Sequence, residues 1–100
     1  MKIGLKVWAS NPIAHVKAAE KLAQDGLCDY IEIYVGNNMT DYIERWHDLP
    51  LAKVIHAPHL AHKFNFADCN LRAYNAKIFS EVQMFADRLE SSLIICHGGT

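Results

Sequence analysis

The alternation of short apolar runs with segments of helical periodicity is the feature that most limits how this chain can fold. Four apolar runs of strand length are separated by three segments whose apolar residues recur at helical spacing. The expected strands cover residues 3–8, 30–35, 53–57 and 93–96, and the expected helices cover residues 12–25, 42–48 and 71–89. Such alternation builds a parallel sheet with right-handed crossovers. The sequence therefore predicts an α/β domain with the element order βαβαβαβ.

Capping residues set the expected starts of the three helices. Asn11 and Pro12 have the order of an N-cap followed by a proline at the first helical position. Asp41 and Glu44 have the spacing of a capping box for the second helix. Asn70 stands directly before the long apolar periodicity of the third segment, where we expect it to act as the N-cap.

Composition narrows the classes of function. A hydrophobic content of 51% is ample for a core, and a net charge of −1 gives little support to a nucleic-acid surface. The three cysteines are odd in number and lack CxxC spacing, which argues against a disulfide framework and favours a reducing cytoplasm. We expect no membrane span and no signal peptide, because no apolar run is long enough and no cleavage site follows the first residues.

Two histidines each close an apolar strand run and are followed by a backbone breaker. His56 ends the third expected strand and His97 ends the fourth. In parallel α/β sheets the carboxyl ends of the strands carry the ligands, so the two imidazoles are expected to share a site. Imidazole suits several divalent metals, and two histidines alone do not choose between them. The alternative is a pair of histidines that are hydrogen-bonded in the mouth of the sheet and bind no ligand.

Glu32 is the second candidate, because it is a carboxylate within an apolar strand. A buried carboxylate needs a partner, and Lys6 on the neighbouring strand is the expected one. The pair is either a structural ion pair or a contact for a sugar hydroxyl or phosphate. Trp8 shares the face of Lys6 and is a candidate to close the apolar face of a sugar ring, although packing is the alternative for it. His59, His62 and Asn65 follow the third strand in a loop expected over the mouth of the sheet.

Together these motifs resemble a known superfamily over the whole chain. The residues that carry the resemblance are the opening Lys2-Ile-Gly-Leu, Glu32, His56-Ala-Pro-His-Leu60, Asn65-Phe, the helix that bears Arg72, and His97-Gly-Gly99. In this order the chain resembles the xylose isomerase-like TIM barrels, which include sugar-phosphate isomerases and epimerases and the endonuclease IV type of AP endonuclease. The resemblance implies a (β/α)8 barrel. Residues 1–100 would supply the first four strands and three helices, the N-terminal half of one barrel domain that continues beyond Thr100.

The resemblance also implies roles for the candidate residues. Endonuclease IV-like members place metal-ligating histidines on strands 3 and 4, which assigns His56 and His97 to a divalent ion such as Mn, Mg, Co or Zn. In the sugar isomerases the early strands line the sugar pocket, which assigns substrate contacts to Lys6, Trp8, Glu32 and His59. The carboxylates that complete the metal site, and the general base, are expected on later strands.

Three functions remain open at this point. The resemblance favours a metal-dependent isomerase or epimerase acting on a sugar or sugar phosphate. The second is a zinc-dependent phosphodiesterase of the AP endonuclease type, and the loop 36–40 counts against it because it lacks the arginine and bulk expected of a DNA-intercalating loop. His59 and Gly98 also depart from that pattern, replacing a tyrosine and a proline. The third is a non-catalytic fragment or binding module of the same fold.

A half barrel carries one further expectation. Closure pairs strand 1 with strand 8 and strand 4 with strand 5, so residues 1–100 by themselves would leave both outer strands unpaired. Unpaired apolar edges recruit other chains. We therefore expect this segment alone to form oligomers or aggregates.

Overall fold

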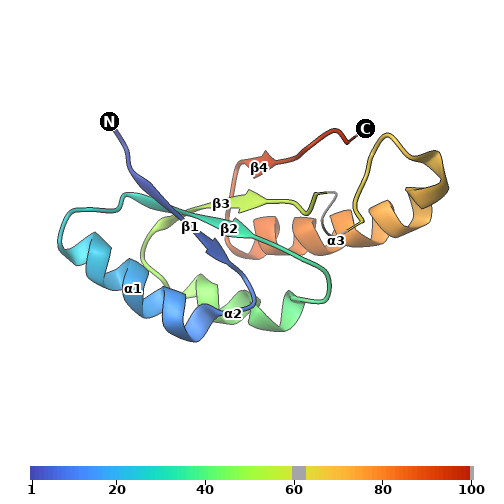
Figure 1. Cartoon of the computed structure of the whole chain (residues 1–100). Coiled ribbons are helices and arrows are strands. Elements are labelled where there is room, and N and C mark those ends of the chain that lie inside the picture. Colours follow the sequence, from blue (N-terminus) through green and yellow to red (C-terminus); the bar gives the residue numbers. More distant parts are fainter. Residues whose placement is uncertain (60–62, 100) are drawn as a thin grey trace.

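The computed structural model describes residues 1–59 and 63–99 of the chain. Four strands alternate with three helices in the predicted order (Figure 1). The strands are β1 (Gly4–Trp8), β2 (Tyr30–Tyr34), β3 (Ala52–His56) and β4 (Ile94–Ile95). The helices are α1 (Pro12–Gln24), α2 (Ile43–His47) and α3 (Arg72–Arg88), with 3-10 turns η1 (Thr40–Tyr42) and η3 (Cys69–Leu71) before the last two. The predicted α/β class is confirmed.

The four strands form one parallel sheet in chain order, β1-β2-β3-β4. The register places Lys6 beside Glu32, and it places Tyr34 between Trp8 and His56. The ladder continues one residue past the strands, since the Val35 N–H donates to the His56 carbonyl at 2.9 Å. Trp8, Tyr34 and His56 are therefore held by regular backbone pairing at the carboxyl ends of their strands.

The two faces of the sheet differ in what covers them. One face carries the apolar row Val7, Ile33 and Ile55, and the three helices pack on it from the same side (Figure 1). The buried helix residues of this core include Ala19, Ile43, Trp46, Ile78, Val82 and Phe85. The opposite face carries the alternate residues of each strand, since successive side chains point to opposite sides. Within the described residues no helix covers this second face, which we call the open face.

The starts of the helices differ from the prediction in their capping contacts. Asn11 stands at the N-cap of α1 with Pro12 behind it, but its side chain makes no capping hydrogen bond. The predicted Asp41–Glu44 capping box is absent: Asp41 lies within the turn η1, and Glu44 instead binds Arg88 of α3. A tertiary ion pair has displaced the local contact.

The predicted cap of the third helix is also wrong in detail. Asn70 lies inside the turn η3, and its backbone N–H donates to the Asp68 carboxylate at 2.9 Å. A short side chain that binds the backbone two residues on forms an Asx turn, which here precedes the helix proper. The start of α3 is thus shifted by one residue from the prediction, and its length is otherwise as expected.

The cysteines and the lengths of the helices can be compared with what composition predicted about disulfides and membrane spans. Cys28, Cys69 and Cys96 are all free thiols, as their number and spacing predicted. Among the described residues, no helix combines the length and the apolar character needed to cross a bilayer.

Candidate functional site

His56 and His97 converge above the carboxyl ends of β3 and β4. Their Nε2 atoms lie 3.0 Å apart, and their rings stack with centroids 5.1 Å apart and an angle of 29° between planes. His56 is buried, with 4% of its surface exposed, whereas His97 is exposed. The spacing of about 4.8 Å between neighbouring strands allows such an approach for side chains at adjacent strand ends. The predicted convergence is therefore confirmed.

Glu32 lies between Lys6 and His56 on the open face. Its Oε1 atom is 3.4 Å from the Lys6 ammonium nitrogen and 3.0 Å from the His56 Nδ1 atom. The contact with His56 is close but off the axis of the ring N–H bond, so the buried Nδ1 atom has no directed hydrogen bond. The terminal torsion of a glutamate is soft, so at this distance the carboxylate can turn onto the axis of the ring N–H bond.

The environment of His56 favours its neutral form. Burial lowers the pKa of this imidazole, and the Lys6 ammonium lowers it further. Glu32 acts in the opposite direction, and the neighbouring His97 and His59 rings also lower the pKa. A neutral imidazole keeps a lone pair on one nitrogen, which is the form that binds a metal or accepts a hydrogen bond.

Tyr34 connects the histidines with Trp8. Its ring makes edge contacts with Trp8, His56 and His59 at centroid distances of 4.5, 5.3 and 5.4 Å. Only 2% of Tyr34 is exposed, and burial raises the pKa of its phenol. His59 in turn lies 5.6 Å from His97, centroid to centroid. The rings form one aromatic cluster around Tyr34, open to solvent at Trp8 and His97.

The segment after the cluster is anchored on α3 by two asparagines. The Asn75 amide accepts from the Asn65 N–H at 3.3 Å and donates to the Asn65 carbonyl at 2.7 Å. The Asn65 side chain itself accepts from the Ala67 N–H, so its role is to shape the turn. Gly99 lies against this turn with φ of 88°, and a side chain there would collide with Asn65. His62, another sequence candidate of this loop, lies outside the described residues.

The nitrogen atoms of His56 and His97 are close to the separation of two ligands of one ion. Imidazole nitrogens bind zinc at about 2.0–2.1 Å, so two of them in a tetrahedral shell lie roughly 3.3–3.4 Å apart. The observed 3.0 Å is slightly shorter than this and fits a direct N–H···N hydrogen bond. Residues 1–59 and 63–99 contain no group of three or more His, Cys, Asp or Glu side chains arranged to hold an ion. The described residues thus offer two ligands of a shell that needs at least four.

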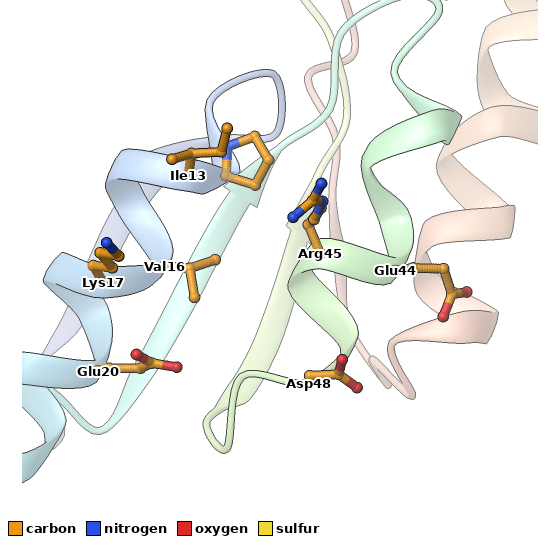
Figure 2. A pocket seen from close by; sticks show the side chains of 8 residues that line it. Ile13, Val16, Lys17, Glu20, Glu44, Arg45 and Asp48 are labelled. Atoms are coloured by element: carbon orange, nitrogen blue, oxygen red, sulfur yellow. The ribbon is translucent and has the colours of Figure 1, made fainter.

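Grooves on the helical side lie away from this cluster. One groove of about 510 Å³ lies between α1 and α2, where Val16 and Glu20 face Asp48 (Figure 2). Glu44 points away from this groove toward α3 (Figure 2), where it forms a two-pronged ion pair with Arg88. A smaller groove of about 370 Å³ lies on the open face below the histidines and is lined in part by Tyr30, Glu32 and Val54. The candidate site and this smaller groove therefore share one side of the sheet.

Comparisons with protein-family models, curated proteins and solved structures found no match for this chain.

Sequence reasoning missed two features of the site. Tyr34 was not singled out, although it lies two residues after Glu32 and must therefore share its face of the strand. The contact of Glu32 with His56 was also missed, because it runs diagonally: Glu32 is paired in register with Val54, two residues before His56. The alternation of side chains along a strand predicts which face of the sheet a residue occupies. Predicting a diagonal contact also requires the register between the two strands.

Proposed function

We propose that this chain forms the first half of a (β/α)8 barrel of the xylose isomerase-like type and serves a metal-dependent isomerase or epimerase of a sugar or sugar phosphate. The observation that carries the proposal is the row Lys6, Glu32, His56 and His97, with one residue from β1, β2, β3 and the end of β4. His56 and His97 lie at the carboxyl ends of their strands, where catalytic barrels carry their ligand groups, and Lys6 and Glu32 lie at the centres of β1 and β2 on the same face.

The arrangement of helices supports a barrel over a doubly wound sheet. A doubly wound sheet carries helices on both faces, and its strand order departs from chain order. Here the strand order follows the chain, and the described helices share one face. The open face would then be the barrel interior. Its lowest row fits close packing, because Gly4 and Ala52 flank the bulky Tyr30, and any side chain at Gly4 would strike the Tyr30 ring.

His56 and His97 would hold the ion through their Nε2 atoms, and residues outside the described ones would complete the shell. When bound, a divalent ion polarises the adjacent oxygens of an aldose or ketose. The chain's own residues supply binding and exclusion of water. The half-exposed Lys6 ammonium is placed to donate to a hydroxyl or phosphate oxygen, and the half-exposed Trp8 indole is placed to cover an apolar sugar face.

His59 would border the substrate on the side of His97. Its ring contacts both Tyr34 and His97, so it lies at the rim of the aromatic cluster. Proton transfer is assigned to a carboxylate on later strands, because the near oxygen of Glu32 already contacts both Lys6 and His56.

One observation also favours the zinc phosphodiesterase as a second candidate. The two close imidazoles from neighbouring strands match the ligand placement implied by the endonuclease IV resemblance. The net charge of −1 speaks against it, because binding of duplex DNA gains most of its affinity from neutralising phosphates.

The test is a direct comparison of the two reactions. The full-length protein, which under this proposal carries the later strands with the general base, is loaded separately with Mn²⁺, Mg²⁺, Co²⁺ or Zn²⁺ and incubated with a panel of aldose and ketose phosphates in D₂O. We expect NMR to show interconversion that requires the metal and is lost in His97→Ala. A duplex with one tetrahydrofuran abasic site is assayed alongside, and its cleavage would favour the phosphodiesterase. Failure of every metal to support either reaction would count against both functions.

A further inference from the structure

The second nitrogen of His56 faces a carboxylate, and this contact leads to a role for Glu32 beyond substrate binding. The Nδ1 atom of His56 is 3.0 Å from Glu32 Oε1, while its Nε2 atom is 3.0 Å from His97 Nε2. The two nitrogens of one buried ring thus each lie 3.0 Å from a different group. Glu32 belongs to β2, His56 to β3, and His97 follows β4.

We propose that Glu32 is a positioning residue that fixes His56 as the Nδ1–H tautomer and so presents the Nε2 lone pair toward His97. The inference rests on the proposed function for its purpose, since a lone pair at Nε2 is what a metal ion requires. Its geometric basis is independent of any ion.

The chemistry of the two partners fixes the direction of the proton. An ionised carboxylate only accepts hydrogen bonds, so a neutral imidazole beside it is stabilised with its proton on the nearer nitrogen. That proton cannot also be at Nε2, because a neutral ring carries only one. A carboxylate that orients a metal-binding histidine in this way is a recurring second-shell arrangement.

Because His56 is buried, its choice of tautomer depends on the groups that contact the ring. His56 is 4% exposed, so water does not readily replace a missing partner at Nδ1. Lys6 contacts the same carboxylate oxygen from the other side at 3.4 Å. Removal of Lys6 leaves this acceptor for His56 in place.

The tautomer can be measured without activity or metal. Protein with ¹⁵N-labelled histidine is studied at pH 8, above the ordinary imidazole pKa of about 6.5. Long-range ¹H–¹⁵N spectra separate protonated from bare ring nitrogens, and His56→Gln assigns the signals. We expect His56 to carry its proton on Nδ1. A wild-type ring with the proton on Nε2 would overturn the inference.

Three variants separate the role of Glu32 from general structural support. Glu32→Leu removes the acceptor and should shift the His56 proton to Nε2. Glu32→Gln keeps a carbonyl oxygen that can accept from Nδ1, so this variant should keep the Nδ1–H tautomer. Lys6→Met is the matched control on the same face, and it should leave the tautomer unchanged. An unshifted proton in a folded Glu32→Leu variant would refute the assignment. If that variant does not fold, the wild-type tautomer and Glu32→Gln still decide.

The Zn²⁺ affinity is a second measurement, and it distinguishes a failure of the role proposed for Glu32 from a failure of the proposed function. Loss of a second-shell partner typically weakens metal binding by about 10–100-fold, and we expect Glu32→Leu to fall in that range. If the wild type binds none of Mn²⁺, Mg²⁺, Co²⁺ and Zn²⁺, the metal in the proposed function is contradicted, whereas the tautomer result still tests Glu32. If the wild type binds Zn²⁺ although metal-free His56 carries its proton on Nε2, the role of Glu32 fails and the function stands, because a neutral ring can change tautomer when the ion binds.

Discussion

The Nε2 atoms of His56 and His97 lie 3.0 Å apart although 41 positions separate the residues in the chain. Two parallel strand ends, joined by the helix α3, bring them together. The strand pairing fixes this meeting point, because Ile95 is in register with His56 and the Ala57 N–H donates to the Ile95 carbonyl at 2.9 Å. The pair is thus a product of the sheet and does not depend on the loops alone.

The first prediction concerns metal binding by this pair. Replacing His97 with Gln removes one of the two imidazole ligands while keeping a polar side chain. We expect the Zn²⁺ affinity measured by calorimetry to fall by more than the roughly 100-fold upper range of second-shell changes. His47→Gln is the matched control, because His47 lies on α2 and contacts Asp48. Equal affinities in wild type and His97→Gln would remove His97 from the metal site.

The second prediction concerns the Lys6–Glu32 pair. The sequence predicted this pair, and the structure contains it at 3.4 Å, but the Lys6 side chain is 54% exposed and the Glu32 side chain 22%. Exposed ion pairs contribute about 0–1 kcal/mol, so Lys6→Met should change the unfolding free energy by less than about 1 kcal/mol. Urea denaturation measures this value. A loss near 3 kcal/mol, as expected for a buried pair, would mean that Glu32 depends on Lys6 more than the exposure indicates.

Most of the fold was predicted from the alternation of side chains along each strand and from the residues at the strand ends. Successive side chains along a strand must alternate between faces, so the sequence predicted that Lys6 and Glu32 pair and that His56 and His97 converge. The helix caps were predicted less well, because Glu44 has a stronger partner in Arg88 than any that its own first turn offers. The spacing of residues within one segment does not predict a contact between α2 and α3. The same holds for the diagonal approach of Glu32 to His56.

The third prediction follows from the Glu44–Arg88 pair and concerns pH. The Arg88 guanidinium binds Glu44 and lowers the pKa of that carboxyl, most strongly through their hydrogen bond. A carboxyl with a lowered folded-state pKa stabilises the fold above its unfolded pKa, and the contribution is lost as pH falls through the folded value. We expect the wild type to lose more stability than Glu44→Gln between pH 6 and pH 3, roughly across the carboxyl range.

Thermal unfolding at several pH values tests this difference. Glu20→Gln is a suitable control, because Glu20 is a glutamate of α1 that faces the groove between α1 and α2 (Figure 2). Parallel pH profiles for wild type and Glu44→Gln would show that the ion pair adds nothing to stability in solution.

The fourth prediction concerns the anchor formed by Asn75. This side chain is 7% exposed and satisfies both the N–H and the carbonyl of Asn65. Asn75→Ala would leave both backbone groups without these partners, which costs about 1–3 kcal/mol for a buried group. We expect a loss of that size in urea denaturation. Asn70→Ala, at an exposed position of η3, should change stability by less than about 0.5 kcal/mol.

The last prediction concerns association of the 100-residue chain. Within the described residues β1 and β4 pair on one side only, and apolar side chains lie exposed beside them: Trp8 is 49% exposed and Leu93 is 54% exposed. Unpaired edges with apolar neighbours recruit further strands, and a charge at the edge opposes this. Light scattering after size exclusion should therefore give a mass that rises with concentration, and Leu93→Lys should reduce the rise. A mass of one chain at every concentration would show that the open face and its edges are tolerated in water, which would favour a self-sufficient four-stranded module over half of a barrel.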